Sequence, residues 1–330
     1  MSRRLVSQTS LPAHLWMLVI GIVVVVSACA RPTPLLRPNG VAVAADGSLY
    51  VMDRGNYRIV HLGVDGQFLG AFGKFGIGPE NIHTGWDMGV DSQGNIYMCN
   101  FVSSENGDFI HDGIKVFTPS GQFLREVGGQ DYLPGGDSLL HKPYGLDIDM
   151  HDRVYIADFD TNTLRIFDVE GRALGTFFGE VGVEAGQFNG INDVAVDDKR
   201  RFVYLVDNIN SRIQQFAIDL PDLGALSLTF VRSFGEYGDG PGQLSYPQGV
   251  AVDDASGRIY VADHANRRIQ VFNAEGRYLA DFSPLNVDLW QVLSLAVGKD
   301  GAIYATDGYN NAIWVFEPDG AVRRRIEVAP

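Results

Sequence analysis

The chain has 330 residues, of which 45% are apolar, so it can bury a sizeable core and is not a disordered protein. Glycine occupies 39 positions without a three-residue period, which excludes collagen and indicates many turns. The net charge is −14 and no basic run is larger than Arg323-Arg324-Arg325, so nucleic acid is not an expected partner.

Residues 1–28 have the layout of a signal peptide for export. Arg3 and Arg4 are the only charged residues in this segment, and an uninterrupted apolar run extends from Leu15 to Val26. The run is shorter than the roughly 20 apolar residues of a membrane span, and it ends in the small residues that signal peptidases require. We therefore expect residues 1–28 to be a cleaved signal peptide.

The end of this segment, Val26-Ser27-Ala28-Cys29, resembles the lipobox of bacterial lipoproteins. The resemblance implies that the Cys29 thiol is acylated with diacylglycerol, so that membrane lipid is one partner and residues 29–35 form a short tether. Ala30 is similar to the residue that follows Cys in lipoproteins sent on to the outer membrane, which implies a periplasmic or cell-surface location. The alternative is an ordinary signal peptide that leaves a soluble periplasmic protein.

From residue 36 to 330 one pattern recurs: a short apolar strand, an Asp or Gly turn, then an aliphatic residue and a tyrosine. The tyrosines of the six copies are Tyr50, Tyr97, Tyr155, Tyr204, Tyr260 and Tyr304. Alternation at period two predicts four strands in each copy, most fully at 249–253, 258–263, 268–272 and 277–282. Four-stranded sheets of this length bury both faces by stacking around an axis. The sequence therefore predicts an all-β fold, a six-bladed β-propeller of four-stranded antiparallel blades.

Residues 260–272, which read YVADHANRRIQVF, resemble the signature of NHL repeats, and the segments at 50–59 and 206–213 repeat it. The resemblance implies an NHL-type propeller. In blade five Asp263 ends the second strand, and we expect Asn266 to take the left-handed backbone of a tight turn. We expect Arg268 to pair with Asp263 across that turn.

Two blades depart from the signature. Blade two has Asn100 in the Asp position, followed by an insertion of eight residues within 101–112. Blade three has Thr161 and Thr163 in the Asn and Arg positions. Blade two is therefore expected to be the specialised blade.

The antiparallel strand order places the long connecting segments on one face of the propeller and the short Asp/Gly turns on the other. We call these the long-loop face (73–86, 101–112, 128–143, 179–191 and 235–247) and the short-turn face. Binding residues concentrate on loops held by a rigid scaffold, so function is expected on the long-loop face.

The residues that enter the inner strands should form a ring at the mouth of the central channel on that face. The ring comprises Asn39, Trp86, Tyr144, Asn192, Gln248 and Leu293, and Asp87 and Asp193 follow in two blades. Aromatic, amide and carboxylate side chains together favour a site for a polar ligand or peptide. The alternative is that these side chains plug the channel and hydrogen-bond one another.

Metal chemistry is the second possibility at this mouth. Some six-bladed relatives resemble the peptidyl-hydroxyglycine α-amidating lyase, in which histidines at the ring position hold zinc, but this ring contains no histidine. His83, His111 and His141 form a residual candidate cluster beside blades two and three. His83 and His141 occupy the repeat position of Asn189 and Ser245, which favours a polar turn role. Resemblance to gluconolactonase-like propellers implies calcium instead, with Asp87, Asn192 and Asp193 as its candidate ligands.

The sequence contains no recognisable nucleophile motif, phosphate loop or metal-binding cysteine pair, so no residue is assigned a catalytic role. No cofactor is predicted, and zinc or calcium stays an alternative. The leading hypothesis is a lipid-anchored binding or scaffold propeller with a protein partner. The alternative is a metal-assisted lyase or hydrolase that acts on a small substrate at the channel mouth.

Overall fold

The computed structural model describes residues 33–103, 109–129, 140–219, 226–282 and 289–328. The predicted signal peptide and Cys29 lie outside the described residues, as do the side chains of 103–112, including that of His111. In the described part of the chain, no helix combines the length and the apolar character that crossing a membrane requires.

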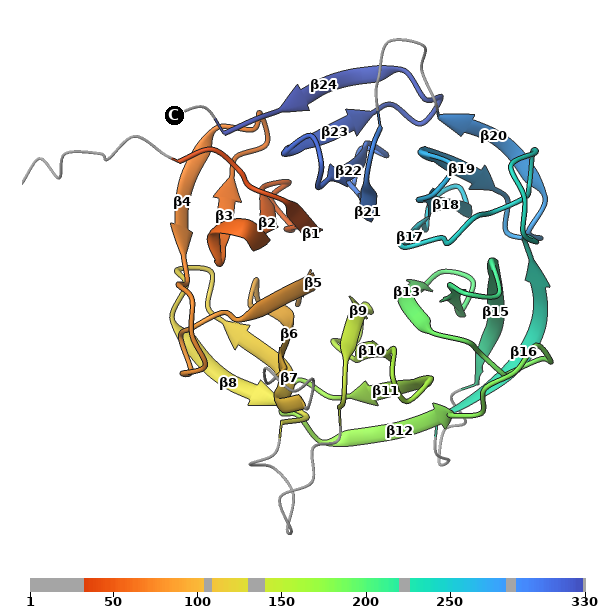
Figure 1. Cartoon of the computed structure of the whole chain (residues 1–330), viewed down its shortest axis with the longest axis horizontal. Helices are drawn as coiled ribbons and strands as arrows, with labels where there is room; N and C mark the ends of the chain where they lie inside the picture. Colours follow the sequence, from red (N-terminus) through yellow and green to blue (C-terminus); the bar gives the residue numbers. More distant parts are fainter. Residues whose placement is uncertain (1–32, 104–108, 130–139, 220–225, 283–288, 329–330) are drawn as a thin grey trace, which may run out of the picture. The chain divides into compact units, whose positions relative to one another are not determined.

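The described residues form 24 strands in six sheets of four (Figure 1). The inner strands are β1 (Pro38–Val43), β5 (Thr84–Val90), β9 (Pro143–Ile148), β13 (Ile191–Asp197), β17 (Val250–Asp253) and β21 (Val292–Val297). The second strands are β2 (Leu49–Asp53), β6 (Ile96–Ser103), β10 (Val154–Asp158), β14 (Phe202–Asp207), β18 (Arg258–Asp263) and β22 (Ile303–Asp307). The third strands are β3 (Arg58–Leu62), β7 (Phe109–Phe117), β11 (Thr163–Phe167), β15 (Arg212–Asp219), β19 (Arg268–Phe272) and β23 (Ala312–Phe316). The outer strands are β4 (Phe68–Phe72), β8 (Phe123–Val127), β12 (Ala173–Phe178), β16 (Ser227–Phe234), β20 (Tyr278–Phe282) and β24 (Val322–Ile326).

Each sheet consists of four consecutive strands that pair in sequence order, and the six sheets surround a central channel. This confirms the predicted six-bladed propeller. The first and last blades keep their own strands, so the ring closes without a strand exchanged between the chain ends. In blade five the four predicted strands agree with β17 to β20 to within one residue at each end.

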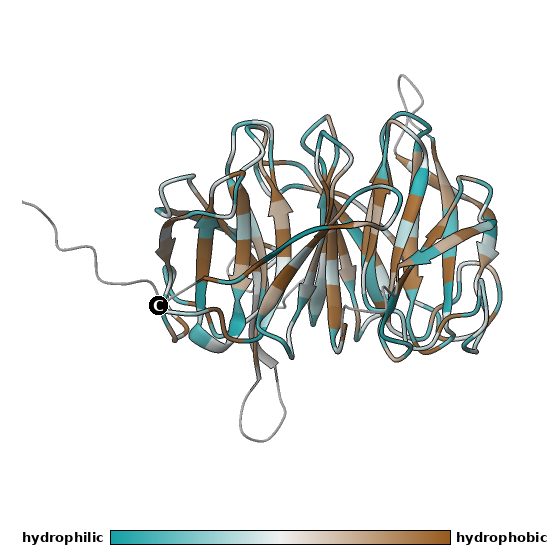
Figure 2. Cartoon of the chain, turned by 90° about the horizontal axis from the view of Figure 1, so that it is seen from above, coloured by the Kyte–Doolittle hydropathy of each residue, from teal (hydrophilic) through white to brown (hydrophobic). Residues whose placement is uncertain are grey.

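The core lies between neighbouring blades. Every residue of the second strands β2, β10 and β22 is buried, because these strands have a blade on each side. The outer strand β4 alternates between half-buried and exposed residues, because one of its faces meets solvent. Figure 2 shows the resulting pattern, with apolar residues along the strands and hydrophilic residues concentrated in the loops.

The insertion in blade two lengthens a hairpin. The strand ladder of β6 and β7 continues beyond Asn100 and Gly113 as far as Ser103 and Phe109. Residues 101–103 and 109–111 are rich in residues that favour strands, so the inserted chain extends the existing pairing.

The signature corner of each NHL-like hairpin confirms one prediction and corrects another. Arg268 Nε donates to Asp263 Oδ2 at 2.7 Å, as predicted, and Arg58 and Arg212 repeat this ion pair in their own blades. The residue in the left-handed conformation, however, is Arg267 (φ 55°), which follows Asn266. Asn266 instead donates its side-chain amide to Asp263 and to the carbonyl of Gly238 in the preceding crossing loop.

Candidate functional site

β-Bulges in the inner strands position the predicted ring residues. In blade two Gly85 pairs with Asn100 and Met88 pairs with Met98, which leaves Trp86 and Asp87 inside the bulge. A bulge interrupts the regular alternation of side chains and redirects those that it carries. Four other inner strands shift register at the equivalent place. As a result one small cavity is lined by Asn39, Trp86, Asp87, Tyr144, Asn192, Asp193, Gln248, Leu293 and Ser294.

The side chains of the ring fill this mouth. The cavity measures about 10 Å³, which is no more than the space for a single water molecule. The indole of Trp86 stacks on the Tyr144 ring with centroids 4.3 Å apart and an interplanar angle of 11°. Asn192 Nδ2 donates to the carbonyl oxygen of Gln248 at 2.6 Å and to its Oε1 at 3.1 Å. The structure therefore brings together the ring residues that the alignment of the six repeats predicts. Their side chains contact one another and close the channel mouth.

A second ring lies directly behind the first and alternates between glycine and a polar side chain. The six residues, in blade order, are Gly40, Asp87, Gly145, Asp193, Gly249 and Ser294. Ser294 Oγ donates to Asp87 Oδ1 at 3.0 Å, and the Asp193 carboxyl group also hydrogen-bonds Asp87. Burial raises the pKa of Asp87 to about 6 and, reinforced by the charge of Asp87, raises that of Asp193 further. The two carboxyl groups therefore titrate as a coupled pair, in which burial and mutual repulsion favour one shared proton.

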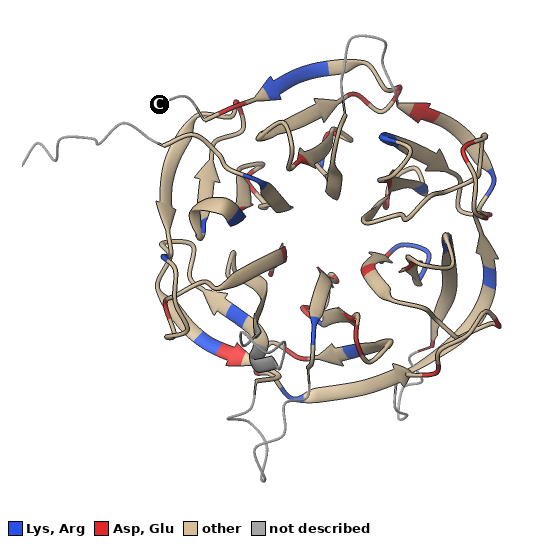
Figure 3. Ribbon diagram, in the orientation of Figure 1, with Lys and Arg blue, Asp and Glu red and all other residues tan. Residues whose placement is uncertain are grey.

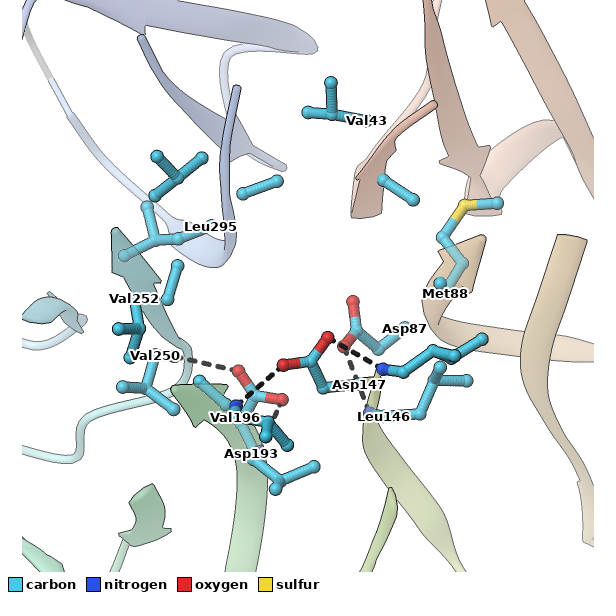
Figure 4. Close-up of a pocket in the computed structure, with 18 of the residues that line it drawn as sticks. Val43, Asp87, Met88, Leu146, Asp147, Asp193, Val196, Val250, Val252 and Leu295 are labelled. Carbon is cyan, nitrogen blue, oxygen red and sulfur yellow. Dashed lines mark hydrogen bonds between the residues drawn. The ribbon is translucent and has the colours of Figure 1, made fainter. Parts of the chain in front are cut away.

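Beyond this second ring the channel widens to a cavity of about 250 Å³ (Figure 4). Asp147 projects into it beside Asp87 and Asp193, and burial raises the pKa of Asp147 to about 7. Sequence reasoning missed Asp147. Its signal is visible in the repeat alignment, where the same position of the other inner strands is occupied only by small residues: Ala42, Gly89, Ala195, Ala251 and Ala296.

The carboxyl groups of Asp87, Asp147 and Asp193 accept hydrogen bonds from backbone N–H groups of the following blade. Asp87 accepts from Leu146 at 3.2 Å, and Asp193 accepts from Val250 at 2.8 Å. Asp147 accepts from Val196 at 2.7 Å. These contacts link blades two to five in a chain around the channel, which is a structural role for the acidic residues.

The residues at the mouth do not fit a metal ion. The ring offers zinc no histidine or cysteine, and calcium requires six to eight oxygen ligands that include ionised carboxylates. Asp87 and Asp193 already accept backbone hydrogen bonds, and burial raises the pKa of both carboxyl groups, which disfavours their ionised form. Across the described ranges, no three or more His, Cys, Asp or Glu side chains are arranged to hold a metal.

The candidate histidines occupy a turn position that recurs in the repeats. The backbone N–H of His141 donates to Asp158 Oδ2, and that of His83 donates to Asn100 Oδ1. Asn189 and Ser245 make the same bond to the signature Asp of their own blades. The backbone N–H group at this position therefore makes the same structural hydrogen bond in four blades, whichever side chain the residue carries.

Three crossing loops of the long-loop face share one shape and expose apolar side chains. A single parallel bridge closes each loop: Phe75 with Ile82, Val181 with Phe188 and Tyr237 with Leu244. The second partner of each bridge is fully buried, whereas Phe75, Val181 and Tyr237 are 60%, 68% and 72% exposed. In each of the three loops, a buried bridge residue therefore holds an exposed apolar side chain, which we call the loop tip (Phe75, Val181 and Tyr237).

Comparison with known proteins agrees with this geometry. The model of the NHL repeat matches residues 35–62 and 244–272, which contain the first three strands of blades one and five. The propeller contains NHL repeats. The matched segments include the Asp, Asn and Arg of the signature corners described above.

The NHL propeller is similar to proteins of several kinds. Peptidyl-glycine alpha-amidating monooxygenase B of Xenopus laevis is 26% identical over 257 residues, which cover 59% of this chain and 28% of that protein. A gluconolactonase from Xanthomonas campestris has a TM-score of 0.60 at 16% identity and 85% coverage of both chains. Virginiamycin B lyase from Staphylococcus aureus has a TM-score of 0.55 at 14% identity, covering 89% of this chain and 87% of its own. At these identities the two solved structures establish the shared fold alone.

Proposed function

We propose that this chain is an exported binding propeller, anchored to a bacterial membrane through the acylated Cys29, whose long-loop face holds a protein partner. Ala30 favours the outer membrane, with the propeller in the periplasm or at the cell surface. The NHL-type propeller fold supports a binding or scaffold role. The residues around the channel supply no complete catalytic constellation on which an enzymatic mechanism can be built.

The observation that carries this proposal is the contrast between the channel mouth and the crossing loops. The mouth is closed to about 10 Å³, whereas the three loop tips hold large apolar side chains in solvent. Apolar side chains grouped on one face of a soluble domain are typical of protein interaction sites. The half-buried Trp86 and Tyr144 extend this surface toward the channel axis.

The partner surface is tested by quantitative pull-down from detergent-solubilised native membranes after a high-salt wash. We expect a partner in stoichiometric amount with the parent chain, and at least a tenfold loss of it with the Phe75→Ser, Tyr237→Ser double variant. A second double variant, Trp86→Ala with Tyr144→Ala, tests whether the channel mouth also contacts the partner, and we expect it to fold but to capture less partner. Met150→Ser is the matched control, because Met150 is 69% exposed on the short-turn face. Equal capture by the tip variant and the control would remove the long-loop face from the proposal.

The lipid anchor is tested separately by the Cys29→Ser variant. Serine has no thiol to acylate, so we expect the variant to leave the membrane fraction or to remain unprocessed. Cell fractionation and the mass of the mature N-terminus report the two outcomes. Normal cleavage with full membrane retention would contradict acylation of Cys29.

A metal-assisted lyase or hydrolase is the alternative, because a lyase and a gluconolactonase share this fold. It requires a bound metal, which elemental analysis of the purified chain detects directly. One equivalent of zinc or calcium, lost in Asp87→Asn or Asp193→Asn, would favour the enzyme. Metal below a tenth of an equivalent in a folded chain would favour the binding propeller.

A further inference from the structure

Two arginines of blade one, Arg37 and Arg54, lie together on the long-loop face. The backbone N–H of Arg37 donates to Asn311 Oδ1 at 2.7 Å, which fixes this segment against blade six. Arg54 opens the short 3-10 helix η1 (Arg54–Asn56) immediately after the signature residue Asp53. Both arginines line the same two hollows of the surface, so a ligand in either hollow can contact both guanidinium groups.

Neither guanidinium forms an ion pair within the described residues. Asp53 is the nearest carboxylate in sequence, but its oxygens accept from the backbone of Leu36, from Asn56 and from Arg58. Arg54 instead lies over the Trp86 ring, with its guanidinium carbon 4.5 Å from the ring centroid. Burial lowers the pKa of Arg54, and the charge of Arg37 contributes to that shift. Arginine nevertheless stays protonated in proteins, so the two side chains present uncompensated positive charge.

This pair of arginines lies in an acidic chain, which has 40 acidic residues against 26 Lys and Arg. Where a carboxylate lies beside a described arginine the two pair, as Arg153 does with Asp149 and Arg200 with Asp197. In the basic run on β24, whose ribbon is blue in Figure 3, Arg323 pairs with Glu317 and Asp300, and Arg325 pairs with Glu327. A pair of like charges without an acid is stabilised by an anion that binds both.

The larger hollow beside the arginines measures about 410 Å³, which lies in the range of small-molecule sites. Leu36 and Leu293 give it an apolar wall, and Tyr309 adds an aromatic ring with a hydroxyl group. Gln291 and Asn311 supply amide groups at its edge. Charged, amide and apolar groups around one volume match an anionic head group attached to a hydrocarbon or aromatic body.

We propose that this hollow between blades one and six binds a small organic anion, with a carboxylate or phosphate head on Arg37 and Arg54. The planar guanidinium groups offer paired N–H donors to either head group. The apolar body of the anion packs against Leu36 and Leu293. This site does not depend on the partner surface proposed above, and its test uses the purified chain without a partner.

The test is isothermal titration of the full chain in detergent with phenylacetate, phenyl phosphate and the neutral analogue phenylacetamide. We expect one of the two anions to bind, and its affinity to fall at least tenfold in Arg54→Gln and in Arg37→Gln. Preference between the two anions identifies the head group. Arg267→Gln is the matched control, because Arg267 also stacks on an aromatic ring of this face, that of Trp290 at 3.5 Å.

Three outcomes would overturn the proposal: neither anion binds at millimolar concentration, phenylacetamide binds as well as the anions, or the control loses affinity as much as Arg54→Gln does. Thermal unfolding of each variant verifies that it folds. If Arg54→Gln unfolds, Arg37→Gln decides alone, because the Arg37 side chain is exposed and its structural bond is made by the backbone.

Discussion

At the scale of the residue, Asp147 shows what burial does to a carboxyl group that meets only backbone donors. Its oxygens accept from the N–H groups of Ile148 and Val196, and burial raises its pKa to about 7. In the unfolded chain the pKa of an aspartate is about 3.9. Folding therefore takes up a proton between these two values. The stability that this group contributes is fully present below about pH 4 and is lost as the pH rises through about 7.

The Asp147→Asn variant has a similar shape but cannot ionise. We expect the free energy of unfolding of the parent to fall relative to the variant between pH 5 and pH 7, by about 1.4 kcal/mol per pH unit at most. Thermal unfolding at half-unit pH steps measures this difference. Asp46→Asn is the control, since Asp46 lies in an exposed turn and its hydrogen bonds to Ser48 lower its pKa. Parallel pH profiles of the parent and Asp147→Asn would show that Asp147 does not titrate in this range.

At the scale of the element, the signature corner joins a hairpin to the crossing loop that precedes it. Arg268 pairs with Asp263 at 2.7 Å and also donates to the carbonyl oxygens of Gly240 and Gln243. Blade two has no such arginine, and the fully buried Lys115 donates instead to the carbonyl oxygens of Gly78 and Asn81. Blades two and five therefore share a cationic side chain that binds the carbonyl oxygens of the preceding crossing loop, and this side chain is the signature arginine in blade five and Lys115 in blade two.

The Asp263→Asn variant removes the closer of the two carboxylates that pair with Arg268, whose side chain is only 10% exposed, and leaves Asp281 at 3.5 Å. Loss of one partner of a buried ion pair costs about 3–5 kcal/mol, so we expect a marked fall in melting temperature. Asp158→Asn is the matched control. Blade three has Thr161 and Thr163 at the corner, whose hydroxyl groups bond each other at 2.7 Å, so no corner arginine loses its partner. An equal fall in both variants would show that backbone contacts of the aspartate, rather than the ion pair, hold the corner.

The sequence predicts the strands well because period-two alternation and the Tyr-anchored strand pattern recur six times. It fails where the outcome depends on contacts between blades. The contact of the Asn266 side chain with Gly238 of the preceding crossing loop is one such case. The left-handed residue is Arg267, at a corner position that is also left-handed in blades one, three, four and six (Tyr57, Asn162, Ser211 and Asn311). The ring at the mouth follows from alignment, but its closure depends on how closely the inner strands approach. Asp147 stands out only after all six inner strands are aligned.

At the scale of the whole molecule, the glycines of the second ring let neighbouring blades approach. A Cβ atom at Gly145 would lie 2.5 Å from the Cα of Asp193, and one at Gly249 would lie 2.6 Å from the carbonyl oxygen of Leu293. A Cβ atom at Gly40 would lie 2.7 Å from the carbonyl oxygen of Trp86. Each glycine therefore faces the backbone of the next blade in the ring.

The Gly145→Ala variant tests this packing. The added methyl group overlaps backbone that cannot move without shifting a blade, so we expect a loss of about 1–3 kcal/mol or more in stability to unfolding. Gly70→Ala on β4 is the matched control, because a Cβ atom at Gly70 meets nothing within 4 Å. Chemical denaturation of both variants measures the effect. Equal stability of the two variants would mean that the inner strands tolerate a wider ring.

The alternation of glycine and side chain divides six similar blades into three pairs, one to two, three to four and five to six. A propeller that gained or lost one blade would bring two glycines or two side chains together at the axis, leaving either a gap or a clash. Blades exchanged two at a time would keep the order intact. The building block for a symmetric design based on this molecule is therefore a tandem of two blades.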